Sequence, residues 1–245
     1  QCVPPGAESC GERGRGVAQR YNAELEVDGG RVAGDQSLRG IRHDRCMVVP
    51  QVVCSASAMS ALKQSDLIAA VNNDTIAADL APPPITIADV WDVAVMKYDR
   101  FPLFTRRYPW EGLENFAFDA LLGKPVILVI HHDGCRDHCR RLVEFIDRLN
   151  DSRVAPTWRS LGEVVRRSYR RRQLTETTVE AELYATETRL QNSTTVARDF
   201  RIKRRESMPS SLKEIRLGSR SMEWARSGGD ISFGAWPGCG RGVGG

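Results

Sequence analysis

The chain has 245 residues, 41% of them hydrophobic and 27% charged, and its formal net charge is +4. This length and apolar content suffice for one large domain or two smaller ones with buried cores, and they exclude a wholly disordered chain. Because the net charge is small, nucleic-acid binding would have to depend on local clusters of basic residues.

Three further features narrow the class of protein. No apolar run approaches 18 residues, so we expect no membrane partner. The seven cysteines form no CxxC pair and are odd in number, which argues against a dense disulfide framework. The chain opens at Gln1 without a signal-peptide pattern, and we interpret it as part of a longer protein whose start is missing.

The first eighty residues pass from irregular to regular patterns. Residues 1–45 are rich in glycine, arginine and proline, which predicts an irregular segment with one short strand at 23–27. The apolar run 47–54 predicts a strand interrupted by Pro50. Residues 55–70 predict a helix or a helix-turn pair.

Alternating helices and strands are predicted next. Residues 86–98 follow the helical period behind a capping-box pattern, and 111–122 predict a second, shorter helix. The apolar run 126–130 lacks that period and predicts a strand buried on both faces. Further helices are predicted around residues 142–149 and from Ser160 to about Arg170. This alternation is typical of a parallel sheet with crossover helices.

The C-terminal tail has a different hydrophobic period from the helices that precede it. From about residue 173 short alternating segments are separated by polar turns, which predicts an all-β, sandwich-like module over 173–245. The glycine-rich stretch 237–245 is unsuited to a strand, so we expect the module to be truncated.

Potential catalytic groups follow the predicted buried strand. His131, His132 and Asp133 stand at its carboxyl end, where ligands bind in α/β sheets. One histidine is predicted to point into a cleft as an acid or base, with Asp133 orienting it. The alternative interpretation is that this histidine is a hydrogen-bonded loop residue without a catalytic role. Although seven ligand-type side chains lie within 131–139, their spacing does not match a structural zinc site, and we predict no metal site within this stretch.

Two other polar clusters have open interpretations. Asn73 and Asp74 lie between apolar segments and could line a sugar-binding cleft, or they could form a plain turn. Five arginines within 166–172 could contact phosphates, but we prefer to interpret them as a solvated helix end whose cations lie near the negative end of the helix dipole. We therefore do not expect a nucleic-acid partner.

The runs 122–133, 142–150 and 158–163 together resemble the closing strand-helix-strand-helix section of polysaccharide deacetylase-like proteins. These are metal-dependent carbohydrate esterases built on a distorted (β/α) barrel. The resemblance implies an α/β fold in which 46–172 form a partial barrel and 173–245 an accessory domain. It also implies that His131 or His132 is the catalytic acid, that a divalent metal such as zinc takes part, and that the partner is a polysaccharide or oligosaccharide.

The sequence departs from that family in its metal ligands. The family's early Asp-Asp motif and its His-x-x-x-His pair are absent, so we expect a chain that is incomplete or inactive as a deacetylase. The alternative is a non-catalytic carbohydrate-binding or structural protein. Its contacts would come from the β-rich tail and from the aromatic residues of the 100–110 connector, which are Phe101, Phe104, Tyr108 and Trp110.

Overall fold

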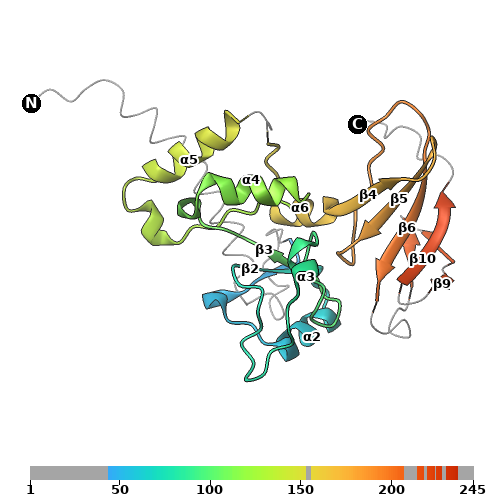
Figure 1. Cartoon of the computed structure of the whole chain (residues 1–245), viewed down its shortest axis with the longest axis horizontal. Coiled ribbons are helices and arrows are strands. Elements are labelled where there is room, and N and C mark those ends of the chain that lie inside the picture. The colour runs from blue at the N-terminus through green and yellow to red at the C-terminus, as the bar shows by residue number, and fades with distance from the viewer. Residues whose placement is uncertain are drawn as a thin grey trace, which may run out of the picture.

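A computed structural model describes residues 44–152, 156–206, 214–217, 220–223, 225–227 and 230–236. They form a mixed α/β part followed by a β-rich part, which lie side by side in Figure 1. The predicted irregular segment 1–45 and its strand at 23–27 fall almost entirely outside the described residues, as does the glycine-rich 237–245.

A small parallel sheet forms the centre of the first part. Its strands are β1 (Cys46–Val48), β2 (Ala69–Asn72) and β3 (Leu103–Thr105), which pair in parallel in the order they follow along the chain. Parallel strands need crossover connections. The first crossover contains the 3-10 helix η1 (Pro50–Val52) and the helix α2 (Ala56–Gln64). The strand predicted at 47–54 is therefore present only before Pro50, because the residues from Pro50 to Val52 form a 3-10 helix and the strand does not resume.

The predicted buried strand at 126–130 is an extended segment beside β3. It makes one parallel bridge, between Arg107 and Leu128, and the backbone amide of Arg107 donates to the Ile127 carbonyl at 2.9 Å. Residues 128–130 are buried, but Val126 is 37% exposed, because this segment is the edge of the parallel layer in the described part of the chain. The parallel arrangement was therefore predicted correctly, and burial on both faces applies only to the second half.

Helices cover both faces of the parallel layer. On one face, Met59 of α2 packs with Ala70 and Leu103. On the other, Val165 of α6 (Leu161–Arg167) packs with Phe104 and with neighbouring apolar side chains of β1 and β2. The strands are therefore buried between two helical layers, as their apolar composition requires.

Two helices pack against the edge segment. They are α4 (Leu113–Leu121) and α5 (Arg140–Asn150), whose apolar stripes meet Leu128 and Ile130. In α5 the buried residues recur at helical spacing and the charged residues face solvent. The buried residues are those predicted from the sequence, Leu142, Phe145, Ile146 and Leu149.

The helix predicted at 86–98 is wrong over its second half. Helix α3 covers only Ile87–Trp91, behind the predicted capping box of Thr86 and Asp89. The chain then extends, and Val95 forms an antiparallel bridge with Leu103 of β3. The apolar residues at 93–96 are buried by this sheet-like pairing, so tertiary contacts override the helical period.

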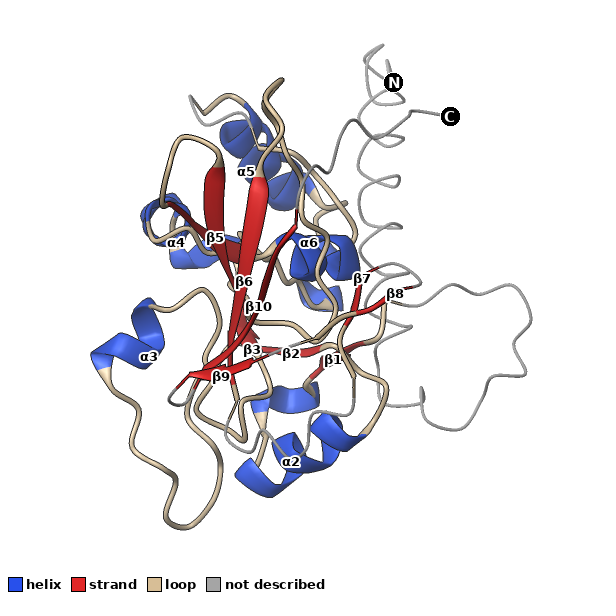
Figure 2. Cartoon of the chain, turned by 90° about the vertical axis from the view of Figure 1, so that its right-hand side faces the viewer, coloured by secondary structure: helices blue, strands red, loops and turns tan. Residues whose placement is uncertain are grey.

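The second part contains one five-stranded sheet in the order β4-β5-β6-β10-β9. Its strands are β4 (Tyr169–Gln173), β5 (Thr178–Leu183), β6 (Asp199–Arg205), β9 (Ala225–Ser227) and β10 (Asp230–Trp236). A separate short hairpin joins β7 (Arg216–Leu217) and β8 (Arg220–Ser221). Figure 2 shows β5, β6 and β10 adjacent to one another. The described residues thus confirm a β-rich tail, in which one five-stranded sheet is accompanied by the two-stranded β7-β8 sheet.

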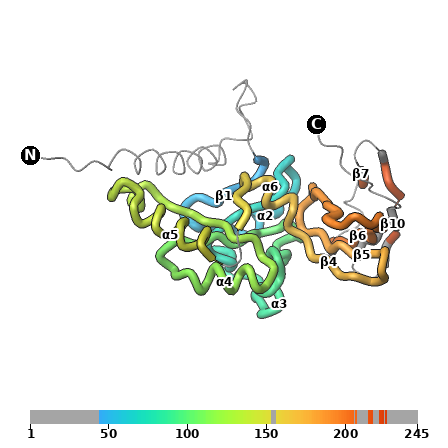
Figure 3. The backbone as a smooth tube through the Cα atoms, turned by 90° about the horizontal axis from the view of Figure 1, so that it is seen from above, coloured from blue at the N-terminus to red at the C-terminus, as the bar shows by residue number. Residues whose placement is uncertain are grey.

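The arginine cluster lies partly in a strand, which corrects the predicted helix end. Helix α6 stops at Arg167, and residues 169–173 form β4, the first strand of the sheet (Figure 3). Arg170 and Arg172 pair in register with Glu182 and Glu180 of β5. Opposite charges facing each other across strands are favourable. A helical interpretation of the arginine cluster could not predict these glutamate neighbours, because they belong to another strand.

Neither part holds a helix long and apolar enough to cross a bilayer within the described ranges.

Candidate functional site

An aromatic stack lies where the parallel strands end. The rings of Tyr108 and Trp110 are stacked, with centroids 4.3 Å apart and an interplanar angle of 13°. The ring of His131 lies at 5.6 Å from that of Tyr108, tilted by 31°. Trp110 is 64% exposed, so the stack presents a large aromatic surface to solvent. We call these three residues the ring stack.

Local backbone structure holds the ring stack in place. Pro109 opens the 3-10 helix η2 (Pro109–Glu111), and the Glu111 side chain accepts the backbone N–H of Tyr108 at 2.9 Å. Gly112 ends this turn with a φ of +95°, a conformation that side-chain-bearing residues rarely adopt. The turn brings Trp110 back over Tyr108.

The predicted catalytic residues are brought to this edge but not into a closed cleft. His131 precedes the 3-10 helix η3 (His132–Cys135). The side chains of His132 and Asp133 are 86% and 60% exposed, with His132 Nε2 lying 3.3 Å from Asp133 Oδ1. Asp133 also pairs with the exposed Arg136 at 2.5 Å. Asp133 therefore contacts His132 and Arg136, whereas His131 packs on Tyr108.

The residues present do not fit the divalent metal that the resemblance implies. No group of three or more His, Cys, Asp or Glu side chains converges anywhere in the described part of the chain. Within 131–139 the groups diverge, since Cys139 is buried against α5 while His132 faces solvent. Burial, with a smaller contribution from the neighbouring Cys135 thiol, raises the pKa of Cys139 to about 11, which disfavours the thiolate that binds metals.

The other predicted sugar-binding residues have local roles. Asn73 Oδ1 accepts a hydrogen bond from Arg106 Nε at 2.8 Å. Asp74 Oδ1 accepts the backbone N–H of Ile76 at 3.0 Å, which closes a turn. The structure thus joins Asn73 to Arg106, and it gives Asp74 the plain-turn role.

The aromatic residues of the 100–110 connector lie partly in the core and partly at the surface. Phe101 and Phe104 are 1% and 0% exposed, so they cannot contact a glycan, and this correction leaves Tyr108 and Trp110 as the accessible aromatic residues. Leu103 and Thr105 belong to β3, which places the connector's first half inside the sheet.

Sequence reasoning missed Arg106, which is 5% exposed. It lies beside Arg107, whose guanidinium binds Asp119 of α4 with Nε–Oδ2 and Nη2–Oδ1 distances of 2.5 and 3.1 Å. The sequence feature that could have identified Arg106 is the alternation of side chains along a strand. Neighbouring residues at the end of a strand point to opposite faces of a sheet. One arginine of the pair therefore had to point away from α4.

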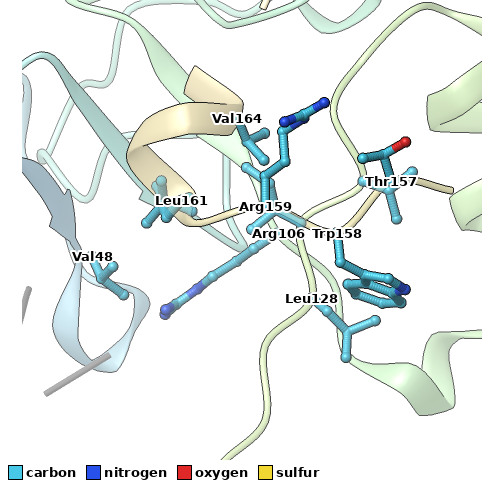
Figure 4. A pocket seen from close by; sticks show the side chains of 11 residues that line it. Val48, Arg106, Leu128, Thr157, Trp158, Arg159, Leu161 and Val164 are labelled. Carbon is cyan, nitrogen blue, oxygen red and sulfur yellow. The ribbon is translucent and has the colours of Figure 1, made fainter. Parts of the chain in front are cut away.

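Arg106 lines a small pocket of about 80 Å³ on the face covered by α6. Figure 4 shows the Arg106 side chain extended toward Val48, with Trp158 and Thr157 on the opposite side and the Arg159 guanidinium turned another way. The remaining walls are aliphatic side chains from the parallel layer and α6, which are Val48, Val71, Val126, Ile127, Leu128, Leu161 and Val164.

Together the fold and site define a mixed α/β protein that carries an exposed ring stack and a separate arginine-lined pocket. Comparisons of the chain with protein-family models, with curated proteins and with solved structures returned no match.

Proposed function

We propose that this chain binds a polysaccharide or oligosaccharide at the ring stack. The observation that carries the proposal is the 64% exposure of Trp110 on a stack already ordered by Tyr108 and His131. A pre-stacked ring presents a rigid apolar face with little entropy to lose on binding, which suits the apolar face of a sugar. The exposed side chains of Asp133 and Arg136 lie shortly after His131 in the chain and supply hydrogen-bonding groups for hydroxyls.

The proposed fold is a segment of a (β/α) barrel with a β-rich accessory module. The observation that supports it is that the parallel strands follow one another in sequence order, as they do in such barrels. The described residues show an open layer, so completing the barrel would require further strands.

Deacetylation by this 245-residue chain is not expected. The reaction that the resemblance implies needs a metal bound by several side chains, and no such cluster exists among the residues described. A carbohydrate-binding role remains compatible with the polysaccharide deacetylase-like resemblance, because both require recognition of a glycan.

The test is binding of the purified full chain to N-acetylated chitooligosaccharides and to acetylated xylan, followed by affinity electrophoresis and calorimetry. We expect Trp110→Ala to weaken binding at least about tenfold, since truncating a central aromatic contact commonly costs about 2 kcal/mol or more. The matched control is Trp91→Ala, because Trp91 is 54% exposed but lies on α3.

Equal weakening by both tryptophan variants, or no binding of either glycan by the wild type, would contradict glycan binding at the ring stack. Acetate release by the wild-type chain would contradict the expected lack of deacetylation.

A further inference from the structure

Arg106 is a buried cation whose hydrogen-bond partners among the described residues are all neutral. Its Nε donates to Asn73 Oδ1 at 2.8 Å and its Nη2 to the Val49 carbonyl at 3.2 Å. No described carboxylate contributes to its electrostatics, in which burial lowers the pKa and the nearby Tyr108 raises it. The guanidinium remains charged at neutral pH because the usual arginine pKa lies above 12.

Other buried cations in the described chain have acidic neighbours. Arg204 Nε lies 2.7 Å from Glu206 Oε1. Lys124, which is 7% exposed, interacts electrostatically with Asp119. Removing a guanidinium from water without a counter-charge is strongly unfavourable. Arg106 therefore differs from them in having no negative group of the described chain beside it, where one would be strongly favourable.

An amide nitrogen without a partner among the described residues lies next to this arginine. It is the buried Nδ2 of Asn73, whose side-chain Oδ1 is bound to Arg106. Buried polar atoms rarely lack partners, so they mark a place where a ligand or water completes the bonding. The free Asn73 N–H is a donor of the kind an anion accepts.

The pocket beside Arg106 is mostly aliphatic. Its volume of about 80 Å³ suits a molecule of a few heavy atoms, and its walls come from the parallel layer, from α6 and from Trp158. A wholly polar anion would leave those aliphatic walls without matching contacts. The combination suits a ligand with one charged end and a short apolar tail.

We propose that the Arg106 pocket binds a small organic carboxylate, with its carboxylate paired to Arg106 and its aliphatic tail against Val71, Ile127 and Val164. The position agrees with the general rule that ligands bind at the carboxyl ends of parallel strands. This site is separate from the ring stack, so the proposal does not depend on glycan binding.

The test titrates the full-length protein with butyrate and with butyramide, its neutral counterpart of similar shape, using calorimetry and the thermal unfolding midpoint. We expect saturable butyrate binding and at least about tenfold weaker butyramide binding. Inorganic phosphate serves as an anion without a tail, and we expect it to bind at least about tenfold more weakly than butyrate. Absence of saturable butyrate binding, or equal binding of butyramide or phosphate, would overturn the proposal.

Variants separate the charge from the pocket. We expect Arg106→Gln to weaken butyrate binding at least about tenfold. Because that change could impair folding, Val164→Phe provides a second route, since it fills the pocket and leaves Arg106 in place. The matched control, Arg159→Gln, alters a pocket-lining arginine that is turned away from Arg106 and should keep binding within about threefold. Wild-type butyrate affinity in folded Val164→Phe, or a tenfold loss in Arg159→Gln, would refute the assignment.

Discussion

The hydroxyl of Tyr184 donates a hydrogen bond to the carboxylate of Asp92, with an Oη–Oδ1 distance of 2.5 Å. Tyr184 follows β5 and Asp92 follows α3, so this buried bond joins the β-rich part to the mixed α/β part. Arg170 of β4 supports the same carboxylate, with its Nη1 at 2.9 Å from Asp92 Oδ1. The two parts thus share a polar contact inside their common core.

Tyr184→Phe is predicted to lower the free energy of unfolding by about 1.5–3 kcal/mol, because it removes a buried hydrogen bond to a charged group. Urea unfolding monitored by circular dichroism measures the change. The control is Tyr169→Phe, whose more exposed hydroxyl accepts the Gln191 N–H at 3.3 Å. We expect that control to change stability by less than about 0.5 kcal/mol. An equal loss of unfolding free energy in the two variants would contradict a specific stabilising role for the hydrogen bond to Asp92.

Alkaline pH should destabilise the protein through the same tyrosine. Burial, and secondarily the hydrogen bond to Asp92, raises the pKa of Tyr184 well above its usual value of 10. Above pH 10 the unfolded chain loses this proton while the folded protein retains it, so stability falls as pH rises, by about 1.4 kcal/mol per pH unit for one proton. Below pH 10 the contribution is fully present.

The measurement compares wild type with Tyr184→Phe, so that other titrating groups largely cancel. The difference in unfolding free energy between the two proteins should shrink as the pH is raised above 10. A difference that stays constant from pH 8 to 11 would be inconsistent with the raised pKa of Tyr184.

Asp119→Asn is predicted to destabilise the protein by about 2–3 kcal/mol. Asp119 is 4% exposed and binds Arg107 through both carboxylate oxygens, so its neutralisation leaves a half-buried guanidinium with Glu111 as its remaining acidic neighbour in the described chain. The matched control is Asp133→Asn, which breaks an exposed pair with Arg136. Exposed pairs contribute little, and we expect that control to cost less than about 1 kcal/mol in urea unfolding. Similar costs would argue against a buried role for Asp119.

The two histidines are predicted to differ in glycan binding. His131→Ala removes a ring from the stack and should weaken binding roughly twofold to tenfold, the range expected for one aromatic contact. His132→Ala should have no effect, because that side chain is 86% exposed and lies beside Asp133. Calorimetry with the chitooligosaccharide measures both.

His131→Phe separates stacking from acid-base chemistry at that position. A phenylalanine keeps the ring but cannot donate or accept a proton, so recovery of binding identifies His131 as a stacking residue. Failure of His131→Phe to recover any binding would point to the imidazole nitrogens instead.

The sequence predicted correctly those elements whose buried face follows from the spacing of their own apolar residues. Helix α5 is the clearest case, because Leu142 and Ile146 recur on one face and that face is the buried one. The extended run 126–130 was predicted from its continuous apolar character. The 86–98 helix was wrong because Val95 pairs with Leu103, a contact that no local window contains.

The candidate site was only partly predictable for the same reason. The sequence placed His131 after a buried segment and Trp110 in an aromatic connector, and both lie at the ring stack. It could not show that Phe104 would be in the core, since Phe104 and Trp110 are equally apolar and only packing distinguishes them.

By itself the sequence determined the α/β character, the order of most elements and which helix faces are apolar, because these follow from spacing between near neighbours. The tertiary structure alone decided that Arg106 is buried without a described acid and that Tyr184 reaches Asp92 across 92 positions. Contacts of this kind depend on which segments, distant in the sequence, pack against one another. The energies of their charges and hydrogen bonds depend in turn on how fully that packing excludes water.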